Sequence, residues 1–183
     1  VYSESFDRMT GGVDYLMGAK IGYLSNAFGA DISGWDEECK DGLSGHNVVA
    51  RPGYVQIGTV AVAQSYDETV AVSAGELTTP ALGQTGDMKL SFKAMAYKSY
   101  IAGRTGTTSN EGEADVNSVV LSLNEGTFDD DTQTKTVAIT SDSWGNVENV
   151  LIKGATENTC ITFSSPEGAA YCRWFLDDIC VSK

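Results

Sequence analysis

The chain has 183 residues, with 12 Lys and Arg against 25 Asp and Glu, so its formal net charge at pH 7 is −13 with the single His neutral. With 42% hydrophobic and 20% charged residues, the composition is that of a globular chain and excludes a disordered acidic segment. The negative charge argues against a nucleic-acid partner and against docking on an anionic membrane, and no apolar run approaches the ~20 residues that a membrane-spanning helix needs.

The length suits one domain over residues 1–183, because no repeat or linker divides the chain. The chain begins at Val1, so we expect a mature form from which a signal peptide has been removed. Four cysteines without C-x-x-C spacing argue against zinc-ribbon and thioredoxin-like sites and leave two disulfides or four free thiols as alternatives. They are Cys39, Cys160, Cys172 and Cys180.

Short segments with period-two alternation follow one another along the chain, separated by glycine-containing turns. Residues 12–24 have the best helical periodicity, but Gly18 and Gly22 interrupt it, and we expect at most one turn there. The pattern predicts an all-β fold of two packed antiparallel sheets. In chain order the candidate strands are 1–6, 53–60, 69–73, 87–96, 118–123, 134–140, 149–153, 159–163 and 171–181.

The last candidate strand carries the most information. Its predicted inner face holds Phe175, Ile179 and Val181. Leu176 is out of phase with that face unless a β-bulge falls near Asp177 and Asp178. Trp174 and Phe175 are adjacent, so one of these two rings must point away from the core.

Four motifs along the chain have a recognisable order. Glu4-Ser5-Phe6 is followed by Gly34-Trp35, by Thr78-Thr79-Pro80-Ala81-Leu82, and by the closing run from Phe175 to Val181. This order resembles the jelly-roll β-sandwich modules of secreted and surface proteins of gut Bacteroidetes, and the wider concanavalin-A-like and MAM-type "choice-of-anchor" group. The resemblance implies a jelly roll without catalysis of its own, attached to glycan-processing or adhesive proteins. It also implies a secreted, periplasmic or outer-surface location, and we expect a monomeric module of a larger protein or complex.

Two adjacent carboxylates inside an apolar strand need an explanation, because burial of an unpaired charge is costly. Three alternatives are open for Asp177 and Asp178. Both can be solvated on an edge of the sheet, or one of them can bond to backbone N–H groups or pair with Arg173. In the third alternative, one of them binds a metal. A jelly roll places its first and last strands side by side, which would bring Glu4 to Asp178, and Ca²⁺ favours such hard oxygen ligands. The resemblance implies calcium at this place. We therefore predict a structural Ca²⁺ held by Glu4, Asp7 and Asp178.

The rival acidic run, 129–131, lacks the spaced ligands of an EF-hand and predicts a solvated turn. No enzyme motif is present: G-x-S-x-G is absent, His46 has no triad context, and the glycines around Arg104 lack the Lys-Ser/Thr ending of a phosphate loop. Although 25 acids always offer glycosidase-like pairs, the pattern favours a non-catalytic protein.

Glycan recognition uses aromatic faces that stack on sugar rings and polar groups that fix the hydroxyls. Tyr97, Tyr100 and Arg104 follow the 87–96 strand and are the residues that packing explains least. Trp35 is a further candidate, with the alternative that it anchors a loop. We predict a carbohydrate-binding module with these four residues in its site. The alternative is a structural or adhesive spacer that contacts protein partners without binding glycan. Further options for the site are Tyr54 and Tyr66.

Overall fold

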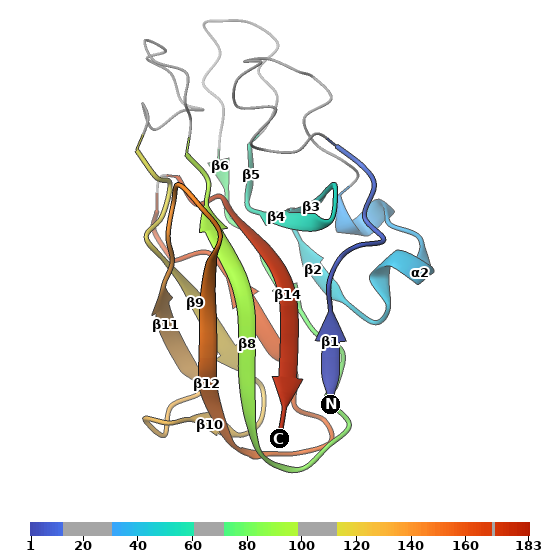
Figure 1. Cartoon of the computed structure of the whole chain (residues 1–183), viewed down its shortest axis with the longest axis vertical. Helices are drawn as coiled ribbons and strands as arrows, with labels where there is room; N and C mark the ends of the chain where they lie inside the picture. The colour runs from blue at the N-terminus through green and yellow to red at the C-terminus, as the bar shows by residue number, and fades with distance from the viewer. Residues whose placement is uncertain (13–30, 61–71, 99–112, 170) are drawn as a thin grey trace, which may run out of the picture.

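The computed structural model describes residues 1–12, 31–60, 72–98, 113–169 and 171–183. Within these ranges the chain forms two large antiparallel sheets that pack face to face, with helix only in η1 (Ile32–Gly34) and α2 (Glu37–Lys40) (Figure 1). The predicted fold class, an all-β sandwich with two antiparallel sheets, is confirmed. From β7 to β14 the chain alternates between the sheets with each successive strand, which is jelly-roll connectivity.

The larger sheet is seven-stranded and has the order β10–β12–β8–β14–β4–β3, with β1 beside the C-terminal half of β14. The long strands β8, β12 and β14 form its centre and run down the front of Figure 1. Its strands are β1 (Tyr2–Glu4), β3 (Val48–Arg51), β4 (Tyr54–Ile57), β8 (Gly86–Ala96), β10 (Thr127–Phe128), β12 (Gly145–Ala155) and β14 (Trp174–Ser182).

The smaller sheet is five-stranded and has the order β11–β9–β13–β7–β2. A separate two-stranded pair, β5 (Thr59–Val60) with β6 (Val72–Ser73), flanks residues 61–71. The strands of the smaller sheet are β2 (Ser44–His46), β7 (Glu76–Thr78), β9 (Ser118–Leu123), β11 (Thr134–Ala138) and β13 (Ile161–Ser164).

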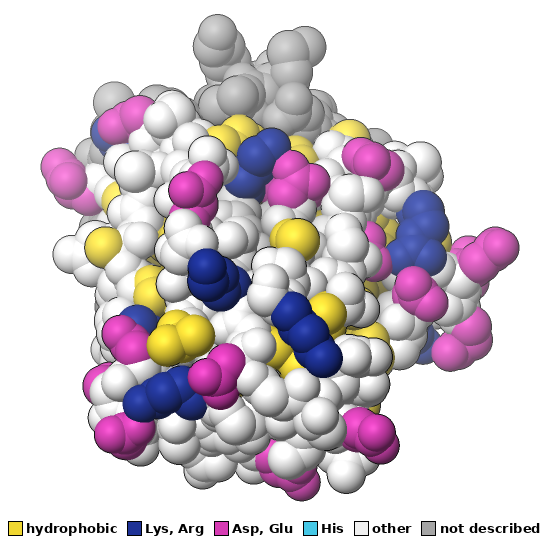
Figure 2. Space-filling view, turned by 60° about the horizontal axis from the view of Figure 1, so that its bottom comes forward, with side chains coloured by type: hydrophobic (Ala, Val, Ile, Leu, Met, Phe, Trp, Pro, Cys, Tyr) yellow, Lys and Arg dark blue, Asp and Glu magenta, His cyan; other side chains and the backbone are white. Residues whose placement is uncertain are grey.

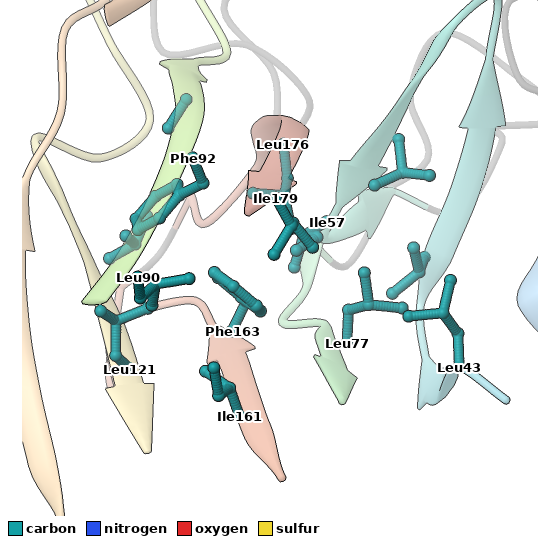
Figure 3. Close-up of a cluster of buried hydrophobic side chains, with 14 of the residues drawn as sticks. Leu43, Ile57, Leu77, Leu90, Phe92, Leu121, Ile161, Phe163, Leu176 and Ile179 are labelled. Carbon is teal, nitrogen blue, oxygen red and sulfur yellow. The ribbon is translucent and has the colours of Figure 1, made fainter. Parts of the chain in front are cut away.

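The core lies between the two sheets and is built by the period-two alternation that the sequence shows (Figure 3). In β8, Leu90 and Phe92 point inward, and the Phe92 ring meets Phe163 of β13 edge to face at 5.2 Å. The inner faces predicted for 87–96, 118–123 and 159–163 are confirmed. Buried on these faces are Met88, Leu90, Phe92, Ala94, Val119, Leu121, Leu123, Ile161 and Phe163.

The predicted bulge in β14 is present, because the register with β8 shifts between Asp177 and Cys180. Asp178 has a positive φ of 47°, a conformation that Asp tolerates better than most residues. The shift returns Ile179 and Val181 to the core. The bulge also corrects the prediction for Phe175: Leu176 and Trp174 occupy the inner face, and Phe175 is the ring that points away from the core.

Strands β2, β3, β7 and β10 were not predicted. Both faces of β3 are buried, so Val48–Arg51 shows no alternation of polar and apolar residues. β2 and β7 have three residues each, too few for a periodic signal. Most of the predicted 12–24 turn and residues 69–71 of the predicted 69–73 strand lie outside the described residues.

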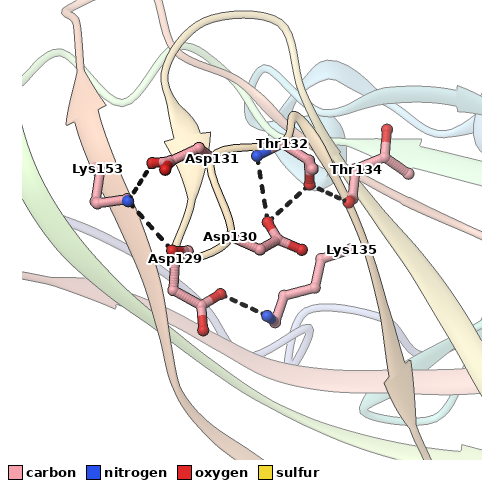
Figure 4. A network of polar contacts seen from close by, with 7 residues as sticks. All are labelled: Asp129, Asp130, Asp131, Thr132, Thr134, Lys135 and Lys153. Atoms are coloured by element: carbon pink, nitrogen blue, oxygen red, sulfur yellow. Dashed lines mark hydrogen bonds and ion pairs between the residues drawn. The ribbon is translucent and has the colours of Figure 1, made fainter.

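The acidic run is the turn between β10 and β11, as predicted (Figure 4). Lys135 donates to Asp129 at 2.5 Å, and its ammonium group holds the pKa of Asp129 below the ordinary value. Lys153 pairs with Asp131 and also donates to the Asp129 carbonyl at 3.2 Å. Asp130 accepts hydrogen bonds within the turn itself. Each acid of this turn therefore has a structural partner.

One face of the molecule carries both signs of charge. Figure 2 shows basic and acidic side chains interspersed on one face, with hydrophobic side chains only in small separate patches. All four cysteines are free thiols, of which Cys172 is buried and Cys180 exposed. Within the described ranges, no helix has the length and hydropathy needed to cross a membrane.

Candidate functional site

A second hydrophobic cluster lies on the outer face of the larger sheet, opposite the core. Along β4, β8 and β14 every second residue points outward, which places Tyr54, Met95 and Phe175 together. The register puts Phe175 directly opposite Met95 of β8 on one side and Gln56 of β4 on the other. Three central strands therefore present one apolar patch away from the main core.

Two partly exposed rings, Tyr97 and Trp144, pack against this patch. Trp144 lies just before β12 and meets Tyr54 edge to face at 5.2 Å, with an interplanar angle of 82°. Phe175 contacts Tyr54 at 5.5 Å and 88°, and Tyr97 at 5.9 Å with a tilt of 42°. We call Tyr54, Met95, Tyr97, Trp144 and Phe175 the outer aromatic cluster. Its buried members form a base, and Tyr97 and Trp144 are the members that solvent reaches.

Polar groups border the outer aromatic cluster. Arg51 at the end of β3 is buried, donates to the side-chain oxygen of Gln56 at 2.7 Å, and places its guanidinium carbon 5.9 Å from the centre of the Phe175 ring. The Gln56 amide nitrogen in turn donates to the Gly58 carbonyl at 2.9 Å. This hydrogen-bonded chain keeps a cation and an amide buried on the outer face without leaving the amide unsatisfied.

A buried ion pair flanks the other side of the cluster. The Arg173 side chain, 2% exposed, donates from Nε to Oδ2 of Asp115 at 2.5 Å and from Nη2 to Oδ1 at 3.1 Å, and Asp115 itself is fully buried. Burial raises the pKa of Asp115 above the ordinary value, although Arg173 works in the opposite direction. The predicted alternative that Arg173 pairs with Asp177 or Asp178 is wrong, because Arg173 pairs with Asp115.

The exposed edge of the cluster carries an ion pair of a different kind. Lys98, next to Tyr97, donates to Asp142 at 3.1 Å, and the Asp142 side chain is 66% exposed. Asp142 lies two residues before Trp144. The two solvent-accessible rings are therefore followed or preceded in the chain, within two residues, by charged groups of both signs. An aromatic surface with polar groups at its rim suits a ligand that has apolar faces and many hydroxyls.

The four residues predicted to bind ligand lie in different parts of the chain's structure or outside the described residues. Tyr97 lies in the outer aromatic cluster, whereas Tyr100 and Arg104 lie outside the described residues. Trp35 is 6% exposed and belongs to the main core, so the alternative that it anchors a loop describes it better than a ligand contact does. Trp144 was not among the predicted ligand-binding residues, and Phe175 was predicted on the opposite face of the sheet.

The predicted metal ligands lie where β1 meets β14. Glu4 stands opposite Ile179, so the predicted adjacency of the first and last strands is confirmed. Glu4 is 5% exposed and both of its oxygens have partners: Oε1 accepts from Phe6 N at 2.7 Å and Oε2 from Arg8 at 2.6 Å. Asp178 pairs with Lys93 at 2.6 Å.

Asp7 is exposed and accepts from Ser5 Oγ at 2.9 Å. The neighbouring Asp177 is half-buried, and this burial raises its pKa to about 6, with Asp178 and Asp7 adding repulsion. In the part of the chain that the structure describes, no three acidic, His or Cys side chains are grouped so as to hold a metal ion. As the side chains stand, Glu4 and Asp178 are satisfied by protein cations and would have to exchange them to bind calcium.

The chain was compared with protein families, curated proteins and solved structures. No protein-family model matches the chain, and no curated protein matches it. Among solved structures it is similar to a CBM61 module in complex with β-1,4-galactotriose, with 18% identity and a TM-score of 0.41, over 79% of this chain and 83% of that one.

It is also similar to a CBM4 module, with 16% identity and a TM-score of 0.42, over 81% of this chain and 83% of the other. A third similar structure is the K3 cleaved adhesin domain of Lys-gingipain from Porphyromonas gingivalis W83, with 13% identity and a TM-score of 0.42, over 75% and 77% of the two chains. Similarity at this level assigns neither family nor ligand to this chain, so its function has to be argued from its own residues.

Proposed function

We propose that this protein is a non-catalytic carbohydrate-binding module whose glycan lies against the outer aromatic cluster. The observation that carries the proposal is that Tyr97 and Trp144 remain partly exposed on a base of buried rings, on the sheet face that the core does not use. A flat ring can cover the apolar face of a sugar, and the fixed base keeps the ring from moving when ligand binds.

The rim supports the same proposal. Sugar hydroxyls need donors and acceptors at the edge of the stacking surface, and Lys98 and Asp142, which lie within two residues of Tyr97 and Trp144 in the chain, offer both. The net charge of −13 favours a neutral glycan over a strongly anionic one, because an anionic chain would be repelled at long range. A secreted or cell-surface location follows for a protein whose ligand is an extracellular polysaccharide.

Structural calcium is a separate proposal and concerns the middle of β14, where β1 pairs with this strand. Four carboxyl groups, those of Glu4, Asp7, Asp177 and Asp178, lie around the junction of β1 and β14. The pKa of Asp177 is raised because ionisation of this half-buried carboxyl group is unfavourable, both through burial and through repulsion from Asp178 and Asp7. A Ca²⁺ ion would relieve that cost if Arg8 released Glu4, with carboxylate oxygens as its ligands.

Affinity electrophoresis tests the glycan proposal. The parent protein and the Trp144→Ala and Tyr97→Ala variants are run through gels that contain laminarin, xylan, galactan or mucin. The proposal expects retardation of the parent by at least one of these and its loss in both variants. Thr136→Ala, on the exposed outer side of β11, is the matched control and should migrate like the parent. Binding that persists in both ring variants would contradict the proposed site, and a parent that no glycan retards would favour the adhesive spacer.

A further inference from the structure

The Asp115–Arg173 ion pair is an expensive feature for a surface module. Both side chains are almost completely withdrawn from water, at 0% and 2% exposure. Buried ion pairs are weak contributors to stability, because the loss of hydration offsets much of the attraction between the charges. Well-packed hydrophobic residues of similar volume would serve the fold as well. The position of the pair therefore suggests a role besides stability.

The pair holds Tyr97 through both its backbone and its ring. Tyr97 N donates to the Arg173 carbonyl at 3.1 Å, and Asp115 N donates to the Tyr97 carbonyl at 2.8 Å. The Arg173 guanidinium carbon lies 4.0 Å from the centre of the Tyr97 ring. The same guanidinium group is locked by two hydrogen bonds to Asp115, and Asp115 also accepts from Arg173 N at 3.2 Å. The Arg51 guanidinium carbon lies farther from its ring, at 5.9 Å from the centre of Phe175.

We propose that Asp115 and Arg173 are positioning residues that fix the Tyr97 ring as a preformed stacking surface for glycan. The consequence for binding rests on the proposed function, whereas the effect on the ring does not. Two hydrogen bonds to Asp115 fix the guanidinium group, and its carbon lies over the Tyr97 ring. A ring held in this way loses little conformational freedom when a ligand stacks on it, so more of the contact energy appears as affinity.

The chemistry of the pair explains why arginine is needed. A guanidinium group is planar and forms a fork of donors, so it can bind a carboxylate at its edge while it lies flat against a ring. A lysine ammonium group could keep the ion pair but has no flat face. Arg173→Lys therefore keeps the positive charge but removes the planar group that lies over the Tyr97 ring. The double variant Arg173→Met with Asp115→Leu removes the ion pair and keeps apolar side chains of similar volume.

The experiment uses the whole chain labelled with 3-fluorotyrosine and follows the ¹⁹F resonance of Tyr97, assigned by its absence in Tyr97→Phe. Melting temperature is measured alongside, and retention on the laminarin, xylan, galactan and mucin gels is compared. In both variants we expect a shifted and motionally averaged Tyr97 resonance, with the other tyrosine resonances in place. Affinity should fall by about twofold to twelvefold, the factor that corresponds to the free-energy cost of ordering one freed side chain when the glycan binds.

A Tyr97 resonance and an affinity that are unchanged in a folded variant would overturn the proposal. Arg173→Lys is the milder change, and it carries the test if the double variant does not fold. If the parent binds none of the four glycans, the proposed function fails, while the ¹⁹F measurement still decides whether the ion pair positions the ring. An averaged resonance with unchanged affinity would show that the ring is held by the pair but does not contact the glycan.

Discussion

Phe175→Ala should damage stability and the outer aromatic cluster at the same time. The Phe175 side chain is fully buried although it points away from the core, and it contacts Tyr54 at 5.5 Å, Tyr97 at 5.9 Å and Trp144 at 6.4 Å. Truncation of a buried Phe to Ala costs about 3–5 kcal/mol of the free energy of unfolding. The edge-to-face contact with Tyr54 accounts for about 0.5–1.5 kcal/mol of that cost. For a chain of 183 residues the melting temperature should fall by roughly 6–20 °C.

Phe92→Ala is the matched control, because it makes the same truncation on the opposite face of the same sheet. Phe92 is 2% exposed and meets the Phe163 ring at 5.2 Å, so we expect a similar loss of stability. It leaves the outer aromatic cluster intact. Urea unfolding gives the two free energies, and affinity electrophoresis in the cold, where both variants remain folded, gives the two affinities for glycan.

The two variants should therefore lose comparable stability, but only Phe175→Ala should lose glycan retention. A cost below about 1 kcal/mol for Phe175→Ala would contradict the burial of its side chain, since such a value is typical of surface positions. Equal loss of retention in both folded variants would refute the reasoning that the outer face, and not general stability, determines binding.

Three further predictions follow from the carboxyl groups and the aromatic rings. EDTA should lower the melting temperature and Ca²⁺ should restore it better than Mg²⁺, with a gain of about 2.7 kcal/mol at one hundred times the dissociation constant. Glu4→Gln or Asp178→Asn should remove this response and Asp130→Asn should not, and identical apo and calcium-loaded melting curves would contradict the calcium proposal. Burial raises the pKa of Asp177 from 3.8 to about 6, so its contribution to stability is present below pH 3.8 and is lost as the pH rises through about 6. In EDTA, Asp177→Asn should therefore stabilise the protein more at about pH 7.5 than at about pH 4.5, by about 1–2 kcal/mol after allowance for solvent screening, and an equal effect at both pH values would contradict the raised pKa. Replacement of Tyr97 by Phe should preserve both the fold and most of the glycan retention, because the stacking face is kept, and unfolding of this variant, measured by circular dichroism, would show that the hydroxyl is structural.

The sequence predicts best those strands that have one face in the core and one in water. The alternation in β8 and β9 identified both the strands and their inner faces, because a half-buried strand must repeat with period two. The same signal fails for β3, where Val48–Arg51 is buried on both sides. It also misassigned Phe175, since an outward-facing residue that is covered by other rings has the same hydrophobic character as a core residue.

The candidate site depends on long-range pairing, which no local pattern encodes. Tyr97 could be proposed from its place at the end of a strand, but its neighbours in the cluster come from β4, β14 and the segment before β12. Asp115 and Arg173 are 58 residues apart in the chain, and each makes a backbone hydrogen bond to Tyr97. The β14 bulge could be predicted because Leu176 and Ile179 must both be buried, which a regular strand does not allow.

Intrinsic tryptophan fluorescence gives the most direct test of the proposed glycan site. Trp35 and Trp174 are buried in the main core, at 6% and 0% exposure, and Trp144 in the outer aromatic cluster is the only tryptophan that solvent reaches. Titration with a glycan that retards the parent protein should shift the emission and protect it from acrylamide quenching. In Trp144→Phe, which keeps a stacking ring, the glycan should still bind, but the emission change should disappear. An emission change of full size in Trp144→Phe, or glycan binding by the parent without any change, would contradict a binding site on this face of the sheet.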